Sequence, residues 1–150
     1  MARRSTAEIY TRRRPAALSS AMLWYIAIGS ALGGVSRYLV GGLVQRASGA
    51  GFPTGTLVVN VTGSFLLGLF LRYGLETPTL TPELRAFLTI GFCGGYTTFS
   101  TFSYETAALL EDGEWSRAAL YVGLSVGLSL IATFLGFMAA RELIRLREHV

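Results

Sequence analysis

Lysine is absent from this chain, and cysteine and histidine occur once each. The lone Cys93 cannot form a disulfide within the chain or build a cysteine metal cluster, and His149 stands alone near the end of the sequence. The hydrophobic segments contain no histidine, no clustered carboxylates and no arrangement typical of an activated nucleophile. We therefore predict that the protein is not an enzyme.

Charged residues are also scarce, at 15% of the chain, whereas 51% of the residues are hydrophobic and the mean hydropathy is +0.48. This composition is typical of a membrane protein. We predict an all-α fold with four transmembrane helices at 22–44, 53–73, 85–109 and 115–140. The predicted domains are an arginine-rich N-terminal tail (1–20), a transmembrane domain (21–141) and a C-terminal tail (142–150).

The arginines are distributed unevenly about these spans. The first span is too long for a signal peptide and has no convincing cleavage site, so we expect it to be retained. The positive-inside rule then predicts both termini in the cytoplasm, and the basic charge indicates orientation, not nucleic-acid binding. One side of the predicted bundle holds ten of the 13 basic residues: Arg3, Arg4, Arg12, Arg13, Arg14, Arg72, Arg85, Arg141, Arg145 and Arg147.

The third predicted span contains a polar run, GFCGGYTTFSTFSYE (91–105). Irregular backbone at membrane depth is tolerated where it is buried in protein or lines water. Because Gly94 and Gly95 permit unusual backbone conformations, we predict a helix broken near its middle. The ends of a broken helix expose carbonyl groups to a cation and N–H groups to an anion.

Polar side chains recur every four residues on two other spans. Thr56, Asn60 and Ser64 share one face of the second, and Tyr121, Ser125, Ser129 and Thr133 share a slowly drifting stripe on the fourth. Asn60 suits a pore or an interhelical hydrogen bond equally well. Single hydroxyls often bond their own helix, but four in one stripe favour a polar path.

Four further residues suggest how such a path would treat an anion. Phe99 and Phe102 lie among hydroxyls, and ring edges offer weakly electropositive C–H groups to a small anion. Arg37 lies within the first span, where it either reaches the interface or turns inward. Glu105 could pair with Arg37 or with hydroxyls of the fourth span.

Three segments carry a resemblance to the Fluc/CrcB fluoride channel family: GGVSRY (33–38), FPTGTLVVNVTGSFLLG (52–68) and GFCGGYTTFSTFSYE (91–105). The resemblance covers roughly residues 22–140. It implies a passive fluoride exporter of the inner membrane that protects the cell from fluoride. It also implies an antiparallel homodimer with two pores, formed from chains of dual topology.

The resemblance also implies roles for individual residues. Asn60 would line the polar end of the pore, and Phe99 and Phe102 would contact the ion with their ring edges. Gly94 and Thr97 would offer backbone carbonyls to a structural sodium ion shared by two subunits. The remaining matches are to the polar track, Tyr121, Ser125, Ser129 and Glu105, and to the vestibule and pore mouth, Thr56 and Arg37.

The alternative of similar size is a proton-coupled transporter of the small multidrug type. Such a transporter needs an acidic residue in its first helix, where this chain has Arg37. A purely structural subunit would leave the interrupted third span without explanation.

Overall fold

Three long helices dominate the computed structural model, which describes residues 20–49, 51–77 and 80–148. They are α2 (Ser20–Ser48), α3 (Thr54–Glu76) and α7 (Trp115–Glu148), and each is long and apolar enough to cross a membrane. The described residues are helical with short connections and include no strand, which confirms the all-α prediction. All of the predicted N-terminal tail except Ser20 lies outside the described residues.

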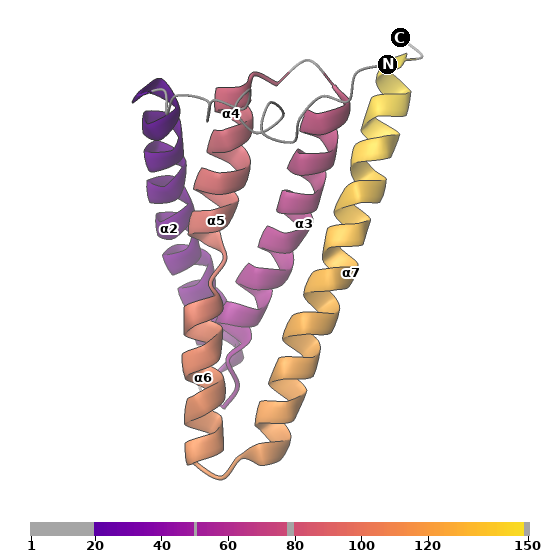
Figure 1. The fold of residues 1–150 in the computed structure, drawn as a ribbon. Coiled ribbons are helices and arrows are strands. Elements are labelled where there is room, and N and C mark those ends of the chain that lie inside the picture. The colour runs from indigo at the N-terminus through magenta and orange to yellow at the C-terminus, as the bar shows by residue number, and fades with distance from the viewer. Residues whose placement is uncertain (1–19, 50, 78–79, 149–150) are drawn as a thin grey trace, which may run out of the picture.

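The predicted span at 85–109 is divided into shorter helices, so the described residues contain three candidate spans where four were expected. The helices follow one another along the length of the bundle, with a gap at Thr97 and Thr98 (Figure 1). This confirms the predicted break near the middle. The four pieces are α4 (Pro82–Ala86), the π-helical η1 (Phe87–Cys93), α5 (Gly94–Tyr96) and α6 (Phe99–Glu111).

Glycines allow two pairs of helices to pack closely, α3 with α7 and α2 with η1. A Cβ at Gly68 would lie 2.5 Å from the Thr133 carbonyl oxygen, and one at Gly136 would collide with the Phe65 carbonyl, so α3 and α7 meet backbone to backbone. A Cβ at Gly29 would likewise lie 2.6 Å from the Phe87 carbonyl oxygen. Small residues permit such close approach between helices in a membrane. Gly29 of the first span therefore serves close packing of α2 against η1.

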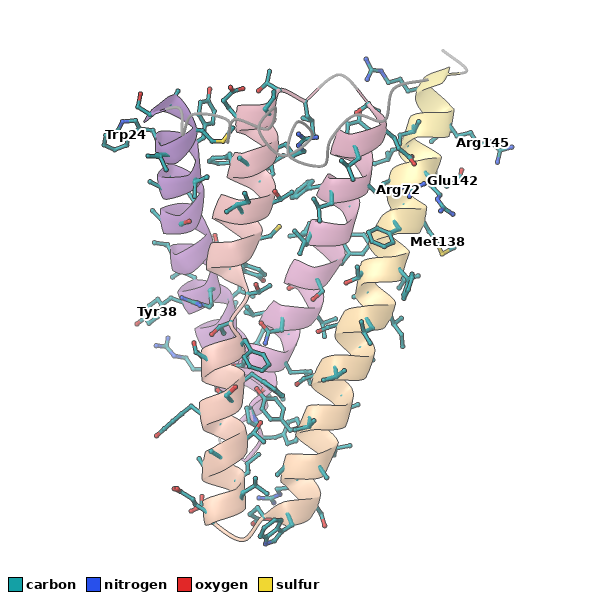
Figure 2. All side chains as sticks on the ribbon, viewed as in Figure 1. Trp24, Tyr38, Arg72, Met138, Glu142 and Arg145 are labelled. Carbon is teal, nitrogen blue, oxygen red and sulfur yellow. The ribbon has the colours of Figure 1, made fainter. Side chains whose placement is uncertain are left out.

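The long helices extend beyond the predicted spans at most of their ends, because a helix can continue into polar surroundings after the hydrocarbon ends. Figure 1 places the start of α2, the α3–α4 connection and the end of α7 at one end of the bundle. Arg72, Glu142 and Arg145 lie toward this end, whereas Trp24, Tyr38 and Met138 project from the bundle (Figure 2). The exposed apolar side chains are those that a lipid environment favours.

Candidate functional site

The break between α5 and α6 occurs at two threonines in extended conformation. Thr97 has φ −80° and ψ 158°, and Thr98 has φ −149° and ψ 115°. Gly94 is helical instead, with φ −65° and ψ −36°. Gly95 serves close packing, since a Cβ there would lie 2.6 Å from the Ser30 carbonyl oxygen of α2. The prediction that the two glycines form the backbone excursion was therefore wrong in position by a few residues.

The side-chain amide of Asn60 binds both backbone groups of Thr98. The Thr98 N–H donates to Asn60 Oδ1 at 2.8 Å, and Asn60 Nδ2 donates to the Thr98 carbonyl at 3.0 Å. The Thr98 hydroxyl in turn accepts from Thr101 N at 3.1 Å and caps α6. Sequence reasoning missed Thr98, although a threonine directly before a helical segment is a recognised N-cap signal.

Arg37 turns inward toward the break. Its Nη1 donates to the Thr97 carbonyl at 3.3 Å, and the residue is half-buried. A guanidinium in an apolar span needs such a carbonyl partner. Of the two positions that the sequence left open, the inward one is observed.

Glu105 accepts hydrogen bonds from two other elements. Thr56 of α3 donates to Oε1 at 2.9 Å, and Tyr121 of α7 donates to Oε2 at 2.6 Å. Tyr121 is fully buried. Among the described residues Glu105 forms no ion pair with Arg37, so the carboxylate pairs with the α7 hydroxyl, which was one of the two expected arrangements.

A groove of about 330 Å³ runs between α3, α6 and α7 beside the break. Ser125 is 6% exposed, and its Oγ makes no hydrogen bond of good geometry among the described residues, although the Tyr121 hydroxyl lies near enough for a weak one. A buried polar group without a partner is rare and marks a place where a ligand or water would bind. The predicted site residues that line this groove are Asn60, Thr97, Phe99, Phe102, Ser125 and Ser129.

Aromatic rings lead away from this groove. The centroids of Phe99 and Phe102 are 5.6 Å apart with an interplanar angle of 44°, and those of Phe102 and Tyr121 are 5.2 Å apart at 51°. The two phenylalanine rings therefore lie side by side on α6. Phe99 is 80% exposed in the single chain, so one side of this path is open.

A second groove of about 410 Å³ lies between α2, α3 and α6. It is lined by Arg37, Thr56, Thr98 and Glu105, together with several glycines of α2 and α3. Glu105 and Tyr121 connect the two grooves, because Tyr121 contacts Phe102 of the first and hydrogen-bonds Glu105 of the second. The predicted site residues thus fall into two neighbouring groups, whereas Gly94 lines neither groove.

An all-helical protein with several candidate spans and exposed apolar helix faces is a multi-pass membrane protein. Comparison with known protein families shows to which family of membrane proteins the chain belongs. The family described as CrcB-like protein, Camphor Resistance (CrcB), matches residues 24–137, so the chain belongs to this family.

Curated relatives are similar over most of the chain. The fluoride-specific ion channel FluC of Geobacter sulfurreducens is 56% identical over 118 residues, which cover 79% of this chain and 95% of that protein. The protein of the same name from Thermus thermophilus is 51% identical over 119 residues, covering 79% and 94% respectively. The family resemblance noted in the sequence is thereby confirmed.

Proposed function

We propose that the protein is a fluoride-selective channel that lets cytoplasmic fluoride leave passively down its electrochemical gradient and so confers fluoride resistance. The relatives' names, which are those of ion channels and not of enzymes, support this proposal. The single structural observation that carries it is the buried Ser125 hydroxyl, which makes no hydrogen bond of good geometry among the described residues and lines a groove that also presents Phe99 and Phe102. The proposed location is the inner membrane.

The groove offers what a dehydrated fluoride ion needs. A small, strongly hydrated anion enters a pore when hydrogen-bond donors replace part of its water shell. The Ser125 hydroxyl can donate, and ring edges at Phe99 and Phe102 add weakly electropositive C–H groups. Asn60 already donates to the Thr98 carbonyl, so its second N–H is the one left for an ion. Chloride is larger and gains less from donors set for fluoride.

The open sides of the grooves support a homodimer. Polar groups facing hydrocarbon are costly, and the groove that holds Ser125 is bounded on one side by a Phe99 that is 80% exposed. A second copy packed against this surface would cover the polar groups and complete two pores. We propose that the two copies are antiparallel, and that the segment of α4, η1, α5 and α6 supplies the fourth span.

We also propose a structural sodium ion between the two copies, held by the carbonyls of Gly94 and Thr97. The Gly94 carbonyl fits this role, because the Thr98 N–H that would bind it in a continuous helix donates to Asn60 instead. The Thr97 carbonyl already accepts from Arg37 and has one further lone pair for a cation. Hard cations prefer oxygen ligands, and the ion would supply fixed positive charge without redox chemistry.

Purified protein in liposomes tests the main proposal. Fluoride efflux, followed with a fluoride electrode, should start when a potassium ionophore allows charge compensation. Chloride release at a comparable rate would overturn fluoride selectivity. Phe99→Ile and Phe102→Ile should each slow fluoride efflux while the protein keeps its oligomeric state. Unchanged efflux in both variants would assign the rings to packing.

A further inference from the structure

The row of aromatic rings continues beyond Tyr121 to Phe52, which lies outside the third and fourth predicted spans. Phe52 lies in the turn before α3, and its centroid is 5.5 Å from that of Tyr121 with an interplanar angle of 83°. Together with the Phe99–Phe102 and Phe102–Tyr121 contacts, this makes an unbroken file of four rings. The file runs from the groove beside the break toward the α2–α3 turn.

Phe52 stands where this file reaches the surface. The residue is half-buried and lines a cleft of about 370 Å³ together with Gln45, Glu105 and Asp112. Glu105 lines both this cleft and the groove of Arg37 and Thr56. The cleft therefore adjoins the groove of Arg37 and Thr56 at the α2–α3 turn.

The side-chain amide of Gln45 holds the turn that carries Phe52. Its Nε2 donates to the carbonyls of Gly49 at 2.6 Å and Phe52 at 3.0 Å, and its Oε1 accepts from Gly55 N at 3.1 Å. The Thr54 hydroxyl lies at 3.5 Å from the same oxygen. Gly49 adopts φ +85°, which suits glycine, so the turn has one defined geometry.

If an anion enters the protein through this cleft, the cleft must offer it at least one electropositive contact. Both oxygens of Glu105 accept hydrogen bonds, and the hydroxyls of Thr56 and Tyr121 that donate them are thereby occupied. Asp112 and Glu105 would repel an anion in the cleft. A ring edge at Phe52 is a weakly electropositive contact there, and Tyr104 lines the same cleft.

We propose that Phe52 is a further pore-lining residue that forms the mouth of the anion path at the α2–α3 turn, and that Gln45 is a positioning residue that holds it there. This inference rests on the proposed fluoride channel. It assigns function to a residue of a turn, where an aromatic side chain would otherwise serve only to cover Tyr121.

The test compares three substitutions in liposome efflux. Phe52→Leu should lower the fluoride rate about tenfold, which is the effect expected when an aromatic contact of ordinary strength is lost. Phe134→Leu is the matched control, because Phe134 is 63% exposed on α7 and should leave the rate unchanged. Gln45→Leu leaves the Phe52 ring in the chain but removes its support, and should lower the rate by a smaller factor.

The readouts separate conduction from folding. All variants should elute from size exclusion like the unaltered protein, and the Phe52→Leu loss should appear in the maximum rate at saturating fluoride. If Phe52→Leu does not fold, Gln45→Leu and Phe52→Met decide the matter. Unaltered efflux in the folded Phe52 variants would overturn the inference. No efflux from the unaltered protein would overturn the proposed function itself.

Discussion

At the scale of single residues, substitution of Ser125 should change fluoride conduction and protein stability in different ways. Its buried hydroxyl makes no hydrogen bond of good geometry among the described residues, and leaving such a group unpaired would cost at most about 1–3 kcal/mol. Ser125→Ala should therefore leave the melting temperature unchanged or raise it, while fluoride efflux falls about tenfold through loss of one ion contact. Ser103→Ala is the control, because the exposed Ser103 hydroxyl bonds the Phe99 carbonyl of its own helix. Efflux from Ser125→Ala at the unaltered rate would remove Ser125 from the path.

The sequence predicted which residue types would gather here, but it could not decide how each would be used. The four-residue spacing placed Asn60 and Ser125 on polar faces, and both line one groove. Periodicity does not reveal a partner in a distant element, so the two hydrogen bonds between Asn60 and Thr98 became visible only in the structure. The direction of Arg37 was undecided for the same reason, since a carbonyl freed 60 positions later fixes it.

At the scale of elements, Asn60 holds the broken helix in place. Asn60→Leu would leave the Thr98 N–H and carbonyl unpaired in a buried site, and Thr98 is only 7% exposed. We expect a loss of roughly 2–6 kcal/mol, since each of the two orphaned groups costs about 1–3 kcal/mol. Denaturant unfolding in detergent should detect this loss. Asn60→Asp keeps the acceptor for Thr98 N–H and should lose less, and equal losses in the two variants would contradict the assignment.

The α3–α7 contact makes a second prediction at this scale. Gly136→Ala should weaken the bundle by more than about 1 kcal/mol, because the new methyl group would collide with the backbone of Phe65. Gly127→Ala on the same helix meets nothing within 4 Å and should slightly stabilise the helix. Thermal unfolding of the two variants gives the comparison. A Gly136→Ala variant as stable as Gly127→Ala would show that the two helices can separate freely.

Element types were predictable from hydropathy, because long apolar runs at membrane length have few alternatives to a helix. The place of the break was not. Glycine attracts attention as a flexible residue, yet Gly95 is required for close approach to Ser30, and the two threonines make the excursion. Distinguishing these uses of glycine needs the neighbouring helix, which the local sequence does not contain.

At the scale of the whole molecule, charge is polarised between the two ends. The end of the bundle where α2 begins and α7 ends lies on the side of Arg72 and Arg145 (Figure 2), α4 carries Arg85, and the sequence before Ser20 holds five more arginines. The α6–α7 turn holds Glu111, Asp112 and Glu114 with Arg117, which pairs with Glu114, and the last turn of α2 holds Arg46. The positive-inside rule favours the arginine-rich end in the cytoplasm. An antiparallel homodimer nevertheless requires some chains to insert the other way.

The arginine bias and the proposed antiparallel homodimer together predict that the chain inserts in both orientations but in unequal amounts. In a Cys93→Ser background, Glu111→Cys and Glu142→Cys place single exposed thiols at opposite ends of the bundle. A membrane-impermeant thiol reagent applied to intact cells should label Glu111→Cys more strongly, and Glu142→Cys above background. Replacing Arg12, Arg13 and Arg14 by glutamine should bring the two signals closer, because arginines near a span set orientation. Labelling confined to Glu111→Cys would rule out an antiparallel homodimer. Equal labelling of the two cysteine variants that keep Arg12, Arg13 and Arg14 would show that the arginines do not bias insertion.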